Sequence, residues 1–118
     1  QFIAHHRLNN LTVFVDWNKQ QLDGELDEII NPFDLEGKFR AFGFDVVTVK
    51  GDDIQGLLNV VKPVLPAGAR PGVVILDSIK GQGVPCLEQL SNSHHLRLTE
   101  EMKETLNETI CQLEAMHD

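Results

Sequence analysis

The segment that follows the first apolar run of the chain concentrates polar groups that could bind a ligand. Asp16, Asn18 and the Gln20–Gln21 pair come directly after this run, and an Asp-Gly turn follows them. Asn18 offers a side-chain carbonyl oxygen, and the backbone carbonyl of Gln20 offers another. Hard cations such as Mg²⁺ prefer oxygen ligands in an octahedral arrangement and often share them with phosphate. The spacing is compatible with half of a metal site, and also with a solvated turn, which is the more common use of such residues.

A second polar segment contains Gly81 and Gly83, in the sequence KGQG, and the His94–His95 pair. Two glycines with this spacing can bring backbone N–H groups to a phosphate, although a plain turn explains them as well. The histidine pair has no cysteine or acid at metal-ligand spacing, which argues against zinc.

Three β-rich runs are expected to position these segments. The runs cover residues 11–16, 44–50 and 72–79. They are almost continuously apolar, which is typical of strands buried on both faces in a parallel sheet covered by helices. Helical patterns cover residues 31–43, 52–65 and 98–118. This alternation predicts an α/β fold, in which ligands bind beyond the carboxyl ends of the strands. The segments 16–31 and 80–98 fall there.

The helical patterns carry signals at their ends. Pro32 near the start and Gly43 just past the end are typical of the boundaries of the first helix. Its inner face is expected to be aromatic, formed by Phe33, Phe39 and Phe42. In the second helix the apolar residues with helical spacing are Ile54, Leu57, Leu58 and Val61, and Pro63 is expected to end the helix or kink its last turn. Thr99 is expected to cap the third.

Composition limits the classes of function. The 118 residues are enough for one domain or part of one, and the formal net charge is -8. Such an acidic surface disfavours nucleic acids and anionic membranes as partners, and no apolar run has the length of a membrane span. Cys86 and Cys111 lack metal-type spacing, and we expect reduced thiols in a cytoplasmic protein. The opening QFIAHHRL reads as the end of a helix already under way, which suggests a piece of something larger.

Three stretches of the sequence resemble the transketolase family. The string HHRLNNLTVFVDWNKQQLDG is similar to the family's H-x-K-L-x-N-L-x-x-x-x-D-x-N-x-x-x-x-D-G. FRAFGFDVVTVKGDDI is similar to F-x-A-F-G-W-x-V-x-x-V-x-G-H-D-I, and KGQGVPCLE to K-G-K-G-V-x-F-M-E. The resemblance covers nearly the whole chain and is closest to the split form, in which the diphosphate-binding half is a separate subunit. It implies a thiamine diphosphate-binding fold, with residues 1–118 as the later part of that domain.

The resemblance also implies a metal site for the cofactor. Asn18 matches the family's metal-binding Asn, and Gln20 matches the residue that lends a backbone carbonyl to the Mg²⁺ (or Ca²⁺ or Mn²⁺) ion. The ion holds the diphosphate of thiamine diphosphate. Leu22 matches an apolar residue that packs on the cofactor, whereas Asp16 is expected to organise the turn rather than to bind metal.

In the second segment the resemblance places Gly81 and Gly83 beside the cofactor. His94 matches a catalytic His that reaches the diphosphate and the substrate. The family's Trp and Gly around that His are replaced by Ser93 and His95. The family's G-D-G motif, whose Asp also binds the metal, does not occur in the 118 residues. The string GDD at 51–53 follows the second β-rich run and is therefore in the wrong place to match it.

We therefore expect part of a transketolase-like enzyme that transfers a two-carbon ketol unit from a ketose, of sugar-phosphate type, to an aldehyde. The family's catalytic Glu comes from a pyrimidine-binding domain or subunit, so a partner chain is expected, in a homodimer or a heterotetramer. Two alternatives remain open. One is a two-carbon transfer subunit of a specialised biosynthetic pathway, and the other is a non-catalytic module with a role in assembly or regulation.

Overall fold

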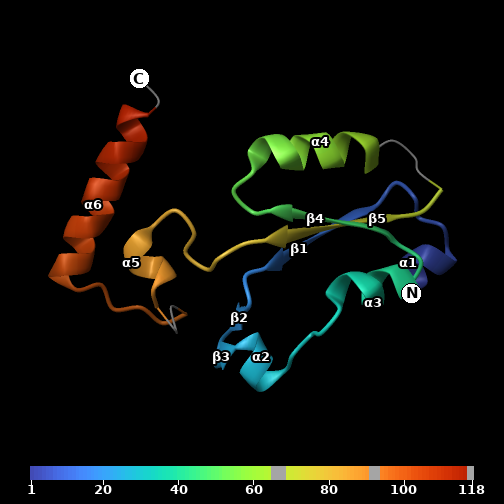
Figure 1. Ribbon diagram of the computed structural model, residues 1–118, viewed down its shortest axis with the longest axis horizontal. Helices are drawn as coiled ribbons and strands as arrows, with labels where there is room; N and C mark the ends of the chain where they lie inside the picture. The colour runs from blue at the N-terminus through green and yellow to red at the C-terminus, as the bar shows by residue number, and fades with distance from the viewer. Residues whose placement is uncertain (65–68, 91–93, 117–118) are drawn as a thin grey trace.

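The chain forms a three-stranded parallel sheet with helices on both faces (Figure 1). The computed structural model describes residues 1–64, 69–90 and 94–116. The strands of the sheet are β1 (Thr12–Trp17), β4 (Asp45–Lys50) and β5 (Gly72–Asp77), in the order β1-β5-β4. The prediction of an α/β fold with a parallel sheet is therefore confirmed, and all three runs predicted as strands form strands.

The central strand β5 holds the sheet together. Val73, Val74 and Ile75 are completely buried, because β1 and β4 pair with the two edges of β5 and helices cover its faces. The flanking strands are less protected, and Phe14 of β1 remains 50% exposed. The prediction that all three strands are buried on both faces is therefore correct for β5 and wrong for β1 and β4, which lie at the edges of the described sheet.

The helices α1 (Phe2–His5) and α3 (Leu35–Ala41) cover one face of the sheet, and α4 (Ile54–Val64) covers the other (Figure 1). Phe39 of α3 packs edge-on against Phe44, with ring centroids 6.0 Å apart. The predicted aromatic inner face is wrong for the other two phenylalanines: α3 begins only after its cap Asp34, which leaves Phe33 77% exposed ahead of the helix, and Phe42 lies at the C-terminal cap, also exposed.

Two regions expected to be loops contain short elements. After β1 the chain forms a hairpin of β2 (Gln20–Gln21) and β3 (Gly24–Glu25), followed by α2 (Leu26–Ile29). After β5 it forms α5 (Pro85–Glu88). The last helix, α6 (Glu100–Ala115), begins at Thr99, whose side chain accepts a hydrogen bond from the Met102 N–H at 3.2 Å. The predicted cap is therefore confirmed. Helix α4, in which Pro63 was expected to end the helix or kink its last turn, extends one residue past Pro63, to Val64.

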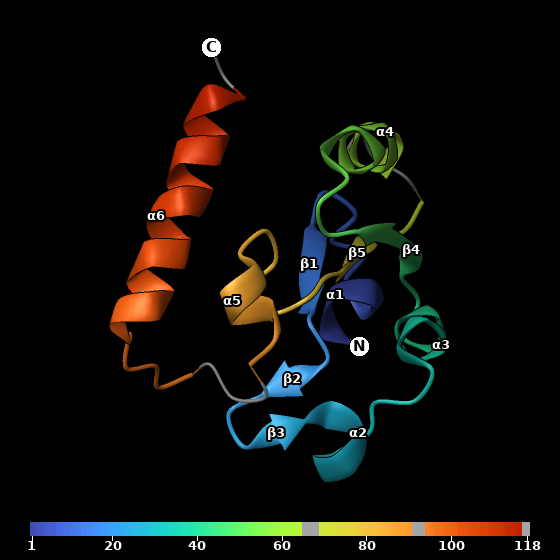
Figure 2. The same cartoon turned by 60° about the vertical axis from the view of Figure 1, so that its left-hand side comes forward.

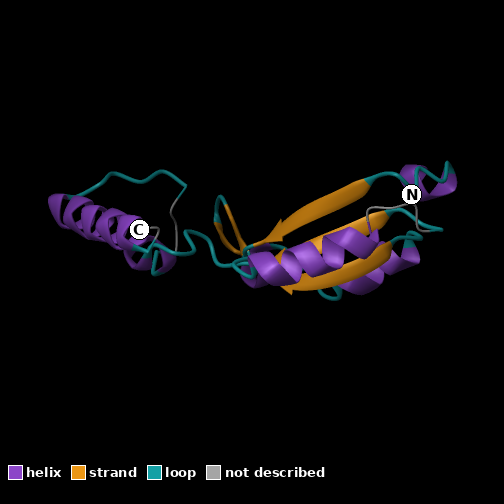
Figure 3. Cartoon of the chain, turned by 90° about the horizontal axis from the view of Figure 1, so that it is seen from above, coloured by secondary structure: helices purple, strands orange, loops and turns teal. Residues whose placement is uncertain are grey.

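The molecule is flat and extended. Its radius of gyration is 17.7 Å, whereas a compact domain of about 100 residues has a radius of about 13 Å. Helix α6 packs against α5 and stands apart from the sheet (Figures 2 and 3). Apolar side chains on several elements are exposed, including Phe14, Ile54 and Ile110. The described residues therefore expose much apolar surface. No helix among the described residues is both long and apolar enough to cross a membrane.

Truncation of the central strand should unfold the sheet. Ile75 is completely buried between β1 and β4, so Ile75→Ala should lower the free energy of unfolding by about 2–5 kcal/mol. The same truncation at Ile54, which is 64% exposed on α4, should cost less than about 1 kcal/mol. Urea denaturation followed by circular dichroism measures both, and equal losses would contradict the assignment of β5 as the core strand.

Candidate functional site

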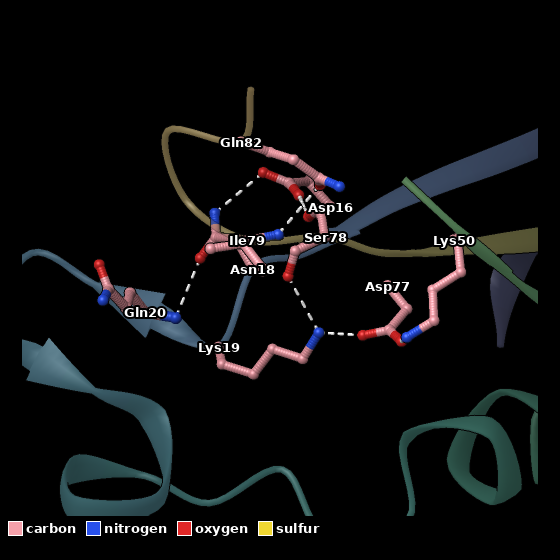
Figure 4. A network of polar contacts seen from close by, with 9 residues as sticks. All are labelled: Asp16, Asn18, Lys19, Gln20, Lys50, Asp77, Ser78, Ile79 and Gln82. Carbon is pink, nitrogen blue, oxygen red and sulfur yellow. Dashed lines mark hydrogen bonds and ion pairs between the residues drawn. The ribbon is translucent and has the colours of Figure 1, made fainter. Parts of the chain in front are cut away.

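Polar side chains gather where β1 and β5 end side by side (Figure 4). The Asp16 carboxylate accepts a hydrogen bond from Asn18 Nδ2 at 2.9 Å and another from the Ser78 hydroxyl. Because the carboxylate can only accept, it fixes the orientation of the Asn18 amide and turns Oδ1 away from itself. Asn18 Oδ1 in turn accepts a hydrogen bond from Gln20 N–H at 2.9 Å. Asp16 thus organises the turn and presents the amide oxygen.

The pairing of the β2–β3 hairpin directs the backbone of Gln20. Gln20 lies opposite Glu25 in the hairpin. The next two residues outward, Lys19 and Leu26, are joined by a hydrogen bond from the Leu26 N–H to the Lys19 C=O at 2.8 Å. Gln20 is therefore in a non-hydrogen-bonded position of the antiparallel ladder, where its N–H and C=O face away from β3. The Gln20 N–H points to Asn18 Oδ1, so the Gln20 C=O and Asn18 Oδ1 lie along the same side of the hairpin.

A chain of ion pairs joins the ends of the three strands. Asp77, the last residue of β5, binds Lys19 Nζ through one carboxylate oxygen and Lys50 Nζ, at 2.5 Å, through the other (Figure 4). The hydrogen bonds from Lys19 and then from Lys50 hold the pKa of Asp77 below its usual value, so the group stays ionised. Lys19 Nζ also donates to Ser78 C=O at 3.0 Å. With Asp16 at the same edge, the two cations, Lys19 and Lys50, face two anions, Asp16 and Asp77.

The glycines of the second loop have different surroundings. Gly81 and Gly83 both have positive φ, 78° and 90°. A Cβ on Gly81 would lie 2.7 Å from the Cβ of Leu87, whereas a Cβ on Gly83 would meet nothing within 4 Å. The Gly83 N–H donates to Glu88 Oε1 at 2.8 Å, so a carboxylate of the chain itself already accepts from this N–H. The proximity of these glycines to a cofactor stays a prediction.

Two further predicted residues lie at exposed positions. Leu22 is in the turn between β2 and β3 and is partly exposed. His94 is exposed, and its ring contacts that of His95 edge-on with centroids 5.4 Å apart. The roles assigned to Leu22 and His94 also stay predictions, and Ser93 lies outside the described residues.

A cavity of about 350 Å³ lies next to this edge. Its apolar wall is made by Trp17, Leu26 and Pro32, and its polar wall by Lys19, Glu25 and Asp27. It borders the turn on the side of Trp17, whereas Asn18 and the other residues predicted to bind the cofactor do not line it. Among the described residues there is also no cluster of three or more His, Cys, Asp or Glu side chains that could hold a metal by themselves. A metal here would depend on amide and backbone oxygens.

Sequence reasoning missed the ion pairs of Asp77. The signal was present, because Lys50 ends the run at 44–50 and Asp77 is the first charged residue of the run at 72–79. In a parallel sheet the carboxyl ends of the strands meet at one edge, and Lys50 lies directly opposite Asp77 in the register. The sequence did not indicate which strand lies in the centre, and therefore which end has neighbours on both sides.

Comparisons with known proteins identify the family. Residues 1–112 match the family model described as "Transketolase, thiamine diphosphate binding domain". The chain belongs to the transketolase family. It is 39% identical, over 102 residues, to the 6-deoxy-6-sulfo-D-fructose transketolase subunit of a Clostridium species, covering 86% of this chain and 37% of that protein. It is 25% identical, over 112 residues, to one of the subunits of the apulose-4-phosphate transketolase of Phocaeicola vulgatus, covering 94% of this chain and 40% of that protein. The chain thus spans about two fifths of these relatives.

Solved structures support the fold. The chain superposes on transketolase from Campylobacter jejuni with a TM-score of 0.77 and 23% identity, covering 92% of this chain and 17% of that one. The similarity to transketolase from Leishmania mexicana has a TM-score of 0.61 and 17% identity, covering 98% of this chain and 20% of that one. The predicted resemblance to the transketolase family and the predicted fold class are both confirmed.

The two glycines of the second loop should respond differently to the same substitution. Gly81→Ala and Gly83→Ala both place a Cβ on a backbone with positive φ, which costs about 1–2 kcal/mol. Gly81→Ala should cost at least ~1 kcal/mol more, because its Cβ would also collide with Leu87. Thermal unfolding of the two variants measures the difference, and a Gly83→Ala variant as unstable as Gly81→Ala would contradict the loop geometry.

Proposed function

We propose that residues 1–118 are the later part of a diphosphate-binding domain in a thiamine diphosphate- and Mg²⁺-dependent transketolase. The complete enzyme would transfer a two-carbon ketol unit from a ketose to an aldehyde. The observation that carries this proposal is the pair of oxygens, Asn18 Oδ1 and the Gln20 carbonyl, on one side of the turn after β1. We assign both to the metal ion, and we assign the G-D-G motif, with its metal-binding Asp, to polypeptide outside these residues.

The chemistry of this edge fits such an ion. Hard divalent cations take neutral amide and carbonyl oxygens as ligands, and Asp16 holds the Asn18 amide with its oxygen directed toward Gln20. The side-chain Oε1 of Gln20 is buried without a hydrogen-bond donor among the described residues. An acceptor in this state is compatible with a donor or cation that arrives with a ligand. These observations support a bound cation at the turn.

A divalent ion at this edge would also suit an anionic cofactor. The chain carries a formal net charge of -8, which by itself would repel a diphosphate. At the carboxyl end of the sheet the charges of Lys19 and Lys50 are balanced by those of Asp77 and Asp16. A divalent cation would add two positive charges, and the neutral ligands Asn18 and Gln20 would not cancel them. The bound ion would therefore make the proposed site locally positive on an acidic protein.

Thiamine diphosphate supplies, when bound, the electron sink that allows the bond beside a ketose carbonyl to break. The residues of this chain would anchor and orient it. Asn18 and Gln20 would hold the cation, and Leu22 would pack on the cofactor from the hairpin turn. Gly81 and Gly83 would lie where the second loop comes close to the cofactor. If a phosphate accepted the hydrogen bond from the Gly83 N–H, it would replace the Glu88 carboxylate, which accepts that bond in this structure. His94 would donate a hydrogen bond to phosphate or substrate.

The enzyme would need a second chain or domain. The similar proteins from the Clostridium species and from Phocaeicola vulgatus are both named as transketolase subunits, which supports a split enzyme whose partner carries the pyrimidine-binding domain. The exposed apolar side chains of β1, α4 and α6 are compatible with burial against further polypeptide. The names of these relatives contain a sulfonated ketose and a sugar phosphate. We therefore propose an anionic sugar as the substrate class.

Calorimetric titration of thiamine diphosphate in the presence of Mg²⁺ into the full-length protein, in its native assembly, tests the proposal. Asn18→Ala should weaken binding at least about 100-fold, because it removes a metal ligand, whereas loss of groups that merely support ligands costs 10–100-fold. The matched control is Asn59→Ala on α4, where the side chain contacts Gln55 on the surface. Wild-type affinity in the Asn18→Ala variant would remove Asn18 from the site.

A further inference from the structure

Lys19 lies between the two proposed metal ligands and has a backbone conformation that disfavours lysine. Its φ is 65°, in the left-handed region that residues with a Cβ rarely adopt. This conformation bends the chain between Asn18 and Gln20, and it allows Gln20 N–H to reach Asn18 Oδ1 at 2.9 Å. A lysine that relaxed to negative φ would separate the two oxygens. The turn therefore needs a contact that holds Lys19 in place.

The side chain of Lys19 provides that contact. Lys19 Nζ binds the Asp77 carboxylate and the Ser78 carbonyl, and it lies 5.0 Å from the centre of the Trp17 ring. Asp77 can act as an anchor because it ends the central strand of the sheet. Its second oxygen, which does not contact Lys19, binds Lys50 Nζ at 2.5 Å. The strained residue of the turn is thus tied to the end of the central strand, whose earlier residues 72–75 are buried.

We propose that Asp77 is a positioning residue for the metal and diphosphate site: by holding Lys19, it keeps Asn18 Oδ1 and the Gln20 carbonyl on one side of the turn. The inference rests on the proposed function, because it concerns the same site. Asp77 does not touch the metal. It acts through the backbone conformation of residue 19, and glycine at that position would adopt the conformation without an anchor.

This role differs from a contribution to overall stability. The side chains of Lys19 and Asp77 are 41% and 24% exposed, and ion pairs with this exposure contribute little to folding. Lys50 offers a matched control, because it binds the same carboxylate from β4 without touching the turn. Removal of Lys50 should leave the turn intact, whereas removal of Asp77 should loosen it.

The test uses full-length protein in its native assembly with four variants: Asp77→Ala, Lys50→Ala, Lys19→Gly, and Lys19→Gly combined with Asp77→Ala. The first readout needs no cofactor. Amide hydrogen exchange of residues 17–21, followed by mass spectrometry, should be about tenfold faster in Asp77→Ala and within twofold of wild type in Lys50→Ala. The second readout is calorimetric affinity for thiamine diphosphate with Mg²⁺, which should fall about tenfold in Asp77→Ala, the order expected from the conformational penalty at residue 19.

The double variant decides whether Asp77 acts through Lys19. Adding Asp77→Ala to Lys19→Gly should change affinity less than twofold, because glycine needs no anchor for positive φ. A tenfold loss in both backgrounds, or wild-type exchange and affinity in Asp77→Ala, would overturn the inference. Failure of the proposed function looks different: the wild-type protein itself would show no Mg²⁺-dependent binding of thiamine diphosphate, whatever the exchange data show.

Discussion

The parallel pairing of β1 and β4 with the central strand β5 determines where this protein can do chemistry. Because all three strands run in the same direction, their carboxyl ends meet at one edge. Asp77 ends β5 there and binds Lys19, from the turn after β1, and Lys50, the last residue of β4. The apolar burial of β5 gives this edge a rigid base, and the ion pairs connect the base to the turn after β1. The positions of the strand ends therefore determine the geometry of any site at this edge.

At the turn after β1, the proposed site would let an acidic chain hold a cation that carries a diphosphate. Asp16 does not need to supply its charge to the metal, because Asn18 Nδ2 and the Ser78 hydroxyl already donate to its carboxylate. Its effect is to orient a neutral amide oxygen. The Gln20 carbonyl is directed to the same side by the register of a very short hairpin. In the proposed site these neutral ligands would leave the positive charge of the ion available to the phosphates, whereas a cluster of carboxylates would reduce it.

Much of this architecture could be predicted from the sequence, and the failures have physical reasons. The three strands, the parallel sheet and the Thr99 cap follow from apolar runs and from side chains that bond the backbone locally. The hairpin at Gln20–Gln21 was missed because two-residue strands carry no periodicity. The exposure of Phe33 was missed because the start of α3 is set by Asp34, whose side chain accepts a hydrogen bond from Gly37 N–H. The Asp77 ion pairs depend on strand order, which no local pattern contains, whereas the resemblance singled out Asn18 and Gln20 directly.

The central claim is that Asn18 Oδ1 and the Gln20 carbonyl bind one divalent ion. A crystal structure of the full-length protein in its native assembly, with thiamine diphosphate and Mn²⁺ in place of Mg²⁺, tests it most directly, because the anomalous scattering of manganese locates the ion independently of the interpretation of the side chains. The account predicts a single manganese peak at the carboxyl end of β1, within bonding distance of both oxygens and of the diphosphate. A manganese ion bound to the diphosphate but held by other groups, with Asn18 still engaged only by Asp16 and Gln20, would contradict it.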